Sequence, residues 1–465
     1  MLDHLPAFGK SSWTTAQTRS IGASISTVSR TVATLELSEL GPRLGLDPDV
    51  EDAAPRTSER RLRRNLGALR HRNYRLYFIG QVISTVGTWM QSVAMPWLAL
   101  LLTHDAFHVG LVVATQFTPM LVAGQFGGLL ADRFSKRRIL VCSQAAFMLP
   151  AFSMFFVSSQ GLAQYWLVLT AALAVGCINV VDVPSRQSFV IEMVGREDLL
   201  NAIALNSTIF NGAAVIGPSL AGLIIGLLGV PLCFLLNGVS YLASIGALLL
   251  MTNLPAVLKV TTGGSMLVRI REGLTYARHD PVVGTLLLNV AVFSLFSMNR
   301  FTLLPIFADQ VLHIGAAGFG FLTASQGLGA LAGALSLAVL QRRLASGNVQ
   351  FLIGLAWSVF LVAFSLSRYY PLSIALLVLS GYCQIAFVAT SNTRIQAATP
   401  DHLRGRVMAL YAQSLMGVGP VGSFQAGALA HFFGAPVAMA FGAVVSGAFV
   451  TLTRLLRPAV FKAGE

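Results

Sequence analysis

The chain has 465 residues, of which 55% are hydrophobic and only 11% are charged. Soluble domains are about 45–50% apolar and about 25% charged, so this composition excludes an ordinary soluble enzyme. The formal net charge of +13 would also fit a nucleic-acid-binding protein. The cations gather beside apolar runs, however, which is the pattern of a membrane protein, and we expect no nucleic acid partner.

Residues 1–65 differ from the rest because they are rich in Ser, Thr and Ala and contain no long apolar run. They end in the basic run Arg60-Arg61-Leu62-Arg63-Arg64. We expect a disordered cytoplasmic tail whose basic end binds membrane lipids. A transit peptide in residues 1–34 and a wrongly assigned start are alternative interpretations.

After the tail, runs of about 20 apolar residues recur, each long enough to cross about 30 Å of hydrocarbon as a helix. Continuous runs of this length favour helices over the strands of a barrel. We expect an all-α membrane protein with twelve transmembrane helices in two six-helix bundles, residues 66–252 and 282–456. The predicted spans are about 74–102, 107–130, 138–159, 163–190, 199–228, 231–252, 282–308, 316–340, 348–367, 370–397, 405–432 and 434–456.

Lys and Arg predict the orientation of these spans. If both termini are inside, 25 of the 32 Lys and Arg residues fall in inner segments, and the outer loops hold only Arg368. Because Lys and Arg resist translocation, we expect both termini in the cytoplasm. The linker 253–281 and the tail 457–465 are predicted on the same side.

The two halves echo each other at a fixed offset, which indicates an internal repeat. Matching residues 205 positions apart are Gly128 and Gly333, Arg137 and Arg342, and Arg138 and Arg343. A related echo links Ser185-Arg186-Gln187 with Thr393-Arg394-Ile395-Gln396. Parallel six-helix repeats are typical of transporters with a substrate site between the halves.

The loop between the second and third spans contains a specific motif. Residues 127–138 read Gly-Gly-Leu-Leu-Ala-Asp-Arg-Phe-Ser-Lys-Arg-Arg. The loop resembles the major facilitator superfamily signature G-x-L-A-D-R-x-G-R-[RK], with Ser135 in place of the second Gly. A solvated loop that obeys the sign rule would explain the cations but not Asp132. The resemblance implies that Asp132 latches the two halves on the cytoplasmic side, near the helix N-terminus that begins at 401–407. The predicted gating residues are Asp132, Arg133, Arg137, Arg138, Arg186, Arg404 and Arg406.

The N-terminal half resembles one branch of that superfamily. Residues 69–76, 87–98, 182–190 and 201–207 are similar to the transmembrane secretion effector group, which includes enterobactin exporters and macrolide-efflux proteins. The resemblance implies export of a siderophore-like or drug-like small molecule across the bacterial inner membrane, with proton coupling. An importer of the same fold and a non-transporting sensor or assembly partner are the alternatives.

Polar residues inside membrane spans are costly and are candidates for function. Asn179 and Asp182 lie in the fourth span. Asp182 is a candidate for proton relay or for binding a cationic substrate, and a structural salt bridge with Arg186, four residues on, is the alternative. Arg300 in the seventh span would favour an anionic substrate if it faces a cavity, and Asp309 at the outer end of that span is a possible counterion.

A further set of aromatic and amide side chains is predicted to line a central cavity. These residues are Trp89, Gln91, Phe210, Asn211, Asn299, Gln326, Tyr382, Gln384, Tyr411 and Gln413. Small residues and prolines predicted to pack helices closely are Gly217, Pro218, Gly222, Gly419 and Pro420. The four cysteines lie in apolar spans and are expected to be core residues.

The sequence contains no nucleotide-binding loop of the Walker type and no metal-ligand spacing, so we expect no cofactor and no direct use of ATP. Energy would then come from an ion gradient or from the substrate's own gradient, and the resemblance implies protons as the coupling ion. We expect the protein to function as a monomer.

Overall fold

The computed structural model describes residues 67–195, 197–252, 266–344 and 346–462, and the secondary structure of these residues is entirely helical. This confirms the all-α prediction. The predicted tail, residues 1–65, lies outside the described residues, as does the first part of the predicted linker.

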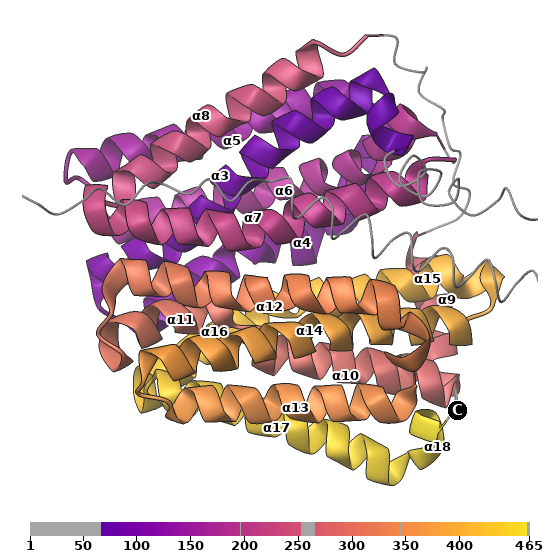
Figure 1. The fold of residues 1–465 in the computed structure, drawn as a ribbon. Coiled ribbons are helices and arrows are strands. Elements are labelled where there is room, and N and C mark those ends of the chain that lie inside the picture. The colour runs from indigo at the N-terminus through magenta and orange to yellow at the C-terminus, as the bar shows by residue number, and fades with distance from the viewer. Residues whose placement is uncertain (1–66, 196, 253–265, 345, 463–465) are drawn as a thin grey trace, which may run out of the picture. The chain divides into compact units, whose positions relative to one another are not determined.

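The first bundle, in indigo to magenta in Figure 1, contains the predicted spans of the N-terminal half. A short 3-10 helix, η2 (Gly67–Arg70), precedes it. Its long helices are α3 (Arg72–Thr103), α4 (Ala106–Arg133), α5 (Lys136–Ser159), α6 (Tyr165–Val194), α7 (Leu199–Leu228) and α8 (Val230–Leu249).

The second bundle, in orange to yellow, differs from the prediction because its first and fifth spans are interrupted. The first consists of α10 (Pro281–Ser297), α11 (Arg300–Ile306) and the π-helix η3 (Phe307–Val311). The fifth consists of α15 (Asp401–Ala412), the π-helix η4 (Gln413–Gly417) and α16 (Gly419–Phe433). The continuous helices are α12 (Gly315–Leu344), α13 (Gly347–Leu366), α14 (Tyr370–Ala398) and α17 (Ala435–Leu456).

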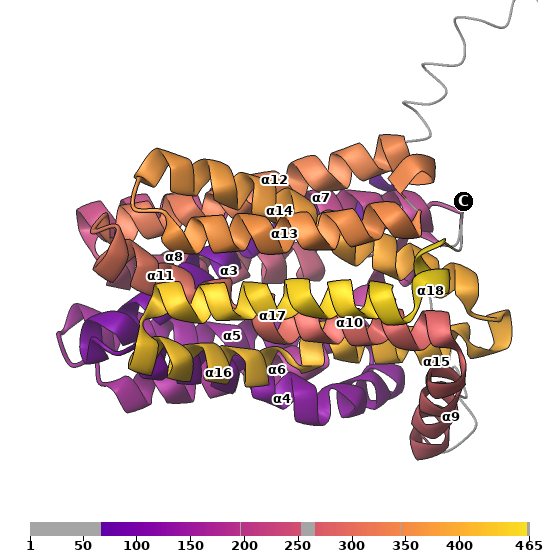
Figure 2. The ribbon, with the colours of Figure 1, turned by 90° about the horizontal axis from the view of Figure 1, so that it is seen from below.

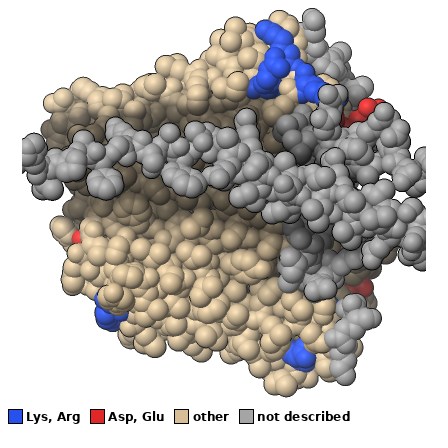
Figure 3. All heavy atoms as spheres, in the orientation of Figure 1, with Lys and Arg blue, Asp and Glu red and all other residues tan. Residues whose placement is uncertain are grey.

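Within the described residues, 10 helical segments are long and apolar enough to cross a membrane. Helix α3 and the interrupted run 401–433 are not among them, so twelve crossings stay a prediction. Charged side chains on the face drawn in Figure 3 lie toward its two ends, and the broad area between them is without Lys, Arg, Asp or Glu wherever described atoms are visible. This distribution fits a chain whose middle lies in hydrocarbon.

The two ends of the bundles differ in their connections. At one end the helices are joined by brief turns, and we call it the short-loop end. The segments there are 104–105, 160–164, 229, 312–314, 367–369 and 434. Two of these turns match across the repeat: Gly229 and Gly434 have φ angles of 89° and 83°, and each is followed by a helix with proline in its first turn. A side chain is strained at such a φ, which explains glycine at both positions.

The opposite end, which we call the basic end, has two helices that were predicted as connections. Helix α9 (Met266–His279) lies within the predicted linker, and α18 (Pro458–Lys462) lies within the predicted tail. Figures 1 and 2 place both at the same end as α15. Phe461 of α18 is 1% exposed, so this part of the tail packs into the second bundle.

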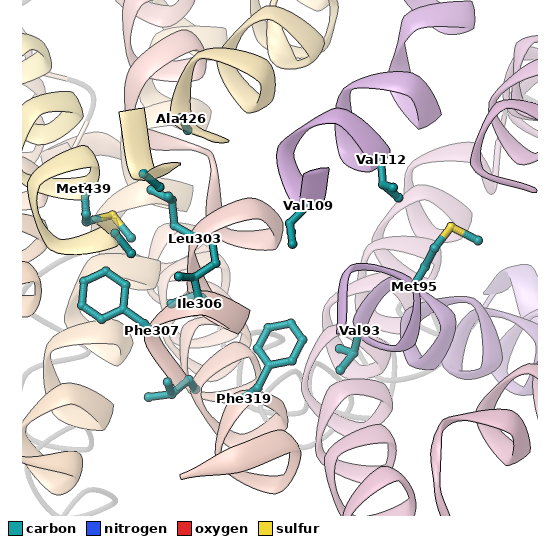
Figure 4. Packing of buried hydrophobic residues seen from close by; sticks show 14 of the residues in the cluster. Val93, Met95, Val109, Val112, Leu303, Ile306, Phe307, Phe319, Ala426 and Met439 are labelled. Atoms are coloured by element: carbon teal, nitrogen blue, oxygen red, sulfur yellow. The ribbon is translucent and has the colours of Figure 1, made fainter. Parts of the chain in front are cut away.

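The largest hydrophobic cluster contains residues of both bundles (Figure 4). Trp97 of α3 stacks on Phe319 of α12, with ring centroids 5.8 Å apart. The prediction of four core cysteines is wrong for two of them, because Cys142 and Cys177 are exposed. Cys233 and Cys383 are buried.

Candidate functional site

Toward the short-loop end, the two bundles meet along two pairs of helices, α4 with α16 and α7 with α12, and we call this boundary the seam. A Cβ placed at Gly110 of α4 would come within 2.6 Å of the carbonyl oxygen of Ser423 in α16. A Cβ placed at Gly222 of α7 would come within 2.9 Å of the Cα of Gly320 in α12. Small residues let helix backbones approach this closely, so these glycines close this half of the seam.

Toward the basic end the same faces are no longer covered. Ala214, Ala221 and Ile225 are buried on one face of α7. Phe210 and Ile203 continue that face at helical spacing, and they are 57% and 50% exposed. The bundles are therefore packed together at the short-loop end and separated toward the basic end.

The fifth span of the second bundle is likewise buried toward the short-loop end and exposed toward the basic end. Ser423 and Gly427 are buried in α16, whereas Met416 of η4 is 64% exposed and Gly405 of α15 is exposed. The opening is thus bordered by helices from both bundles.

The interrupted helices lie where the seam changes from closed to open. Between α10 and α11, Asn299 donates from its side-chain Nδ2 to the Leu295 carbonyl oxygen at 3.0 Å. Ser294 donates to the Leu415 carbonyl oxygen inside η4 at 2.5 Å. These side chains satisfy carbonyl groups that a continuous α-helix would bind itself. Broken and π-helical segments in membrane helices are tolerated when neighbouring groups satisfy the backbone, and they are frequent at functional sites.

Arg300 begins α11 at this break. Its guanidinium carbon lies 5.3 Å from the Trp89 ring of the first bundle and 4.8 Å from the Phe301 ring. Phe210 meets the same Trp89 ring edge-on at 5.2 Å. Within the described residues Arg300 has neither a hydrogen bond nor an ion pair, so the predicted pairing with Asp309 is not formed. An arginine held by aromatic faces alone keeps its hydrogen-bond donors available for a ligand.

Other predicted cavity residues are divided between the seam and the interiors of the bundles. Gln326 donates to Gln384 at 3.1 Å, and Tyr382 accepts from Ser336 at 3.0 Å. Asn211 donates to the Ser207 carbonyl oxygen on its own helix at 2.8 Å.

Two residues are not where the cavity prediction put them. Gln91 is 6% exposed and accepts from Asn237 inside the first bundle. Tyr411 is 5% exposed and donates to the Val388 carbonyl oxygen inside the second bundle at 2.9 Å. The amphipathic pattern did not distinguish these interior faces from the seam, because both faces are polar in part.

Residues predicted to pack helices lie at several contacts. A Cβ placed at Gly217 would come within 2.5 Å of the Trp89 Cβ, and the Pro218 carbonyl oxygen lies beside Gly320. Pro420 is buried, but Gly419 has open space where its Cβ would be. Gln413 folds its side-chain amide over Gly417 in η4.

Asp182 lies in the interior of the first bundle and is 2% exposed. Arg186 donates to it at 2.7 and 3.1 Å, Ser143 at 2.6 Å and Gln144 at 3.0 Å. Neighbouring Asn179 donates to the Val175 carbonyl oxygen at 3.0 Å. Asp182 is therefore fully hydrogen-bonded, which is the geometry of the structural salt bridge that the sequence left as an alternative.

At the basic end, the cations predicted as partners of Asp132 bind other groups. Arg404 pairs with Asp401 at 2.7 Å, and Arg406 pairs with Glu272 of α9 at 2.7 Å. Arg137 donates to the Leu249 carbonyl oxygen at 2.8 Å. The side chains of Asp132 and Arg133 lie outside the described residues, and no hydrogen bond of Arg138 occurs among the described ones.

One contact between the bundles was not predicted from the sequence. At the short-loop end, Asp105 and His431 are hydrogen-bonded at 2.6 Å, although 326 positions separate them. Asp105 lies in the predicted loop after the first span, and His431 lies at the end of the eleventh span on the same side of the membrane. This shared side was the signal available in the sequence.

Comparison with known proteins assigns the chain to a family. The sequence profile of the transmembrane secretion effector family matches residues 64–463. An enterobactin exporter, EntS, of Escherichia coli O1:K1 / APEC is 27% identical over 406 residues, which cover 83% of this chain and 93% of that protein. EntS of Shigella boydii serotype 18 is 28% identical over the same lengths.

Solved structures of transporters share the fold at low sequence identity. A bacterial homolog of the human lysosomal transporter Spinster, in an inward-facing and unoccupied conformation, has a TM-score of 0.64 and 15% identity, and the match covers 84% of this chain and 97% of the other. A POT family transporter in complex with 5-aminolevulinic acid has a TM-score of 0.68 and 12% identity, with 83% and 96% covered. These are transporters and not enzymes. The chain belongs to the transmembrane secretion effector family of major facilitator superfamily transporters.

Proposed function

We propose that this protein is a twelve-helix secondary transporter that exports a small siderophore-like or drug-like molecule by alternating access. The observation that supports this most directly is the seam, which is closed at the short-loop end and open toward the basic end. An unpaired cation lies between aromatic rings near the transition. A carrier with its substrate site accessible from one side is expected to have this arrangement.

The orientation follows from the positive-inside rule, which assigns the basic end to the cytoplasm. The conformation is then inward-facing, with both chain termini cytoplasmic in the bacterial inner membrane. The names of the relatives, which are enterobactin exporters, support export over import. Protons are the proposed coupling ion, and a monomer is the proposed working unit.

Arg300 is the proposed contact for a negatively charged group of the substrate. A guanidinium offers several N–H donors in one plane, and the neighbouring Trp89 and Phe210 rings provide flat apolar surfaces. Such a pair of features suits a molecule that combines an acidic or phenolic oxygen with a planar ring. Asn299, which directly precedes Arg300, and Gln413 of η4 lie at the interruptions of these two spans and are proposed to adjust when substrate binds.

Asp132 is the proposed latch of the opposite, outward-facing state. When the basic ends approach each other, Arg404 and Arg406 would exchange their present partners, Asp401 and Glu272, for Asp132. Both present pairs are partly exposed, and exposed pairs contribute only about 0–1 kcal/mol, so the exchange would cost little.

The transport proposal is tested in everted membrane vesicles from cells that overproduce the protein, because their basic ends face the bath. Enterobactin and ethidium serve as the anionic and cationic probes. We expect enterobactin to accumulate when respiration energises the vesicles and to leak out when an uncoupler collapses the proton gradient. Failure of both probes and of a wider drug panel to accumulate, with the protein present and monodisperse, would contradict the proposal.

The role of Arg300 is tested in the same vesicles with Arg300→Ala. Hydrogen bonds to charged groups are worth about 1.5–3 kcal/mol, so we expect KM for enterobactin to rise about 10- to 100-fold. Arg368→Ala at the short-loop end removes the same charge and is the control, with unchanged KM expected. An unchanged KM in Arg300→Ala would place the anion-binding group elsewhere.

A further inference from the structure

Three ionisable side chains meet at the closed end of the seam. Asp105 precedes α4 and accepts from two imidazoles, His108 Nδ1 at 2.7 Å and His431 Nδ1 at 2.6 Å. His108 belongs to the first bundle and His431 to the second. Asp105 is 20% exposed, and the two histidines are 39% and 45% exposed, so water at the short-loop end reaches the group.

Local structure explains why these residues are held in place. Asp105 caps α4 by accepting the Phe107 amide N–H at 3.0 Å, which satisfies one of the free donors at a helix start. His108, one turn into α4, is packed edge-on against the Tyr165 ring at 4.7 Å. His431 lies in the last turn of α16, where the helix dipole favours a protonated imidazole.

The surroundings supply few other charges. Tyr165 of α6 donates to the backbone oxygen of His108 at 3.1 Å, and His104 precedes Asp105 in the same turn. Phe107 packs on the His431 ring from α4, and Phe424 of α16 packs on Phe107. Among the described side chains of the elements packed here, α3, α4, α6, α11, α16 and α17, no Lys or Arg forms an ion pair with Asp105.

Asp105 is the negatively charged member of the three. Burial by itself would raise the pKa of Asp105, but the hydrogen bonds from the Phe107 N–H and the two imidazoles outweigh it, and the pKa lies below its usual value. Imidazole is the side chain whose ordinary charge change falls between about pH 5 and 8, so a change of pH in that range acts on the histidine side of these hydrogen bonds.

We propose that Asp105, His108 and His431 form a proton-operated outer latch, in which protonation of His431 from the short-loop side strengthens closure of the seam. This inference rests on the alternating access proposed above. When the seam opens, His431 moves away from Asp105 with its bundle, so a protonated His431 has its anionic partner only in the closed state. Acid at the short-loop side therefore favours the inward-facing state, and this effect disappears as the imidazole loses its proton.

The size of the effect follows from the exposure of the pair. Partly exposed ion pairs contribute about 0.2–1 kcal/mol. We therefore expect the ratio of closed to open seam to rise about 1.4- to fivefold from pH 7.5 to pH 5.5. In an exporter driven by protons, this direction returns the empty carrier to the cytoplasm-facing state.

The test measures the distance between spin labels at Leu102→Cys and Phe433→Cys, one in each bundle at the short-loop end. The full chain is reconstituted in lipid nanodiscs with its four native cysteines replaced by serine or alanine. In the otherwise unchanged protein, acid should enlarge the short-distance population. His431→Gln should abolish the pH response, and His431→Lys should hold the short-distance population at its acid value at both pH values.

His313→Asn is the matched control, because His313 lies in a turn at the same end and asparagine tolerates its φ of 53°. Its pH response should equal that of the unchanged protein. A full pH response in His431→Gln, or a pH-dependent seam in His431→Lys, would overturn the latch. If the distance across the seam responds to pH as expected but the vesicles transport no probe, the latch stands and only the proposed export is refuted.

Discussion

The fourth helix of each bundle carries a buried or partly buried arginine, and the two bundles satisfy its charge in different ways. Arg186 of α6 donates to Gln81 of α3, and Arg394 of α14 donates to Gln350 of α13. One turn before Arg186 is the carboxylate Asp182. One turn before Arg394 is the neutral Thr390, which donates to its own helix.

The second bundle uses its C-terminal end instead of a carboxylate. Arg394 donates to the Val460 carbonyl oxygen of α18, and a Cβ at Gly347 would come within 2.3 Å of the Phe461 oxygen. The first bundle thus neutralises its arginine within its own core, whereas the second needs a segment added after its last long helix. Both bundles keep the arginine and a glutamine acceptor, but the glutamine comes from the first helix of one bundle and the third helix of the other, and the remaining partners differ.

The largest effect is expected from Arg186→Leu. Removing one partner leaves Asp182 buried without a counterion, which costs about 3–5 kcal/mol. Unfolding in mixed micelles of dodecylmaltoside and SDS measures this loss. Arg394→Leu is the comparison, and its loss should be smaller because no carboxylate is left behind. Equal losses of unfolding free energy in the two variants would contradict the proposed difference in how the bundles compensate the two arginines.

Asp182→Asn should have a smaller effect, because the amide still accepts hydrogen bonds while the counterion of Arg186 is lost. A hydrogen bond to a charged group is worth about 1.5–3 kcal/mol, and we expect a loss of that size in the same assay. Transport per folded molecule should then be largely kept. A variant of normal stability that has lost its substrate-dependent proton current would show that Asp182 relays protons.

Truncation after Arg457 removes α18 and tests the second bundle. Arg394 loses the Val460 carbonyl oxygen, and an unsatisfied buried donor costs about 1–3 kcal/mol. The same truncation in Arg394→Leu should cost less, and the difference isolates the interaction. If both backgrounds lose the same stability, α18 acts through Phe461 packing alone.

Thr390→Asp should give the smallest effect, because it installs in α14 the carboxylate that α6 already has. In the truncated chain we expect a gain of about 1 kcal/mol, since the new acid pairs with Arg394 one turn later. In the full-length chain the gain should be near zero. The stabilities of the full-length and truncated chains, each with and without Thr390→Asp, form a thermodynamic cycle. Identical gains in both chains would refute the idea that α18 takes the place of a carboxylate beside Arg394.

The sequence was sufficient to predict the helices of both bundles, because apolar runs of about 20 residues leave the backbone no alternative to helix in lipid. It also predicted the basic end from the positions of Lys and Arg and the family from local motifs. The salt bridge between Asp182 and Arg186 could also be proposed from the sequence, because residues four apart share a helix face.

Only the tertiary structure decided how the bundles meet. Helix amphipathicity could not distinguish Gln91, which lies inside a bundle, from Trp89, which lies at the boundary, because both side chains of α3 are buried and the pattern does not show which helix covers each. Nor could it predict the break before Arg300, where the Asn299 side chain satisfies the Leu295 carbonyl oxygen. The contact of Asp105 with His431 joins residues 326 positions apart, and it exists only because small residues let α4 and α16 pack closely at one end.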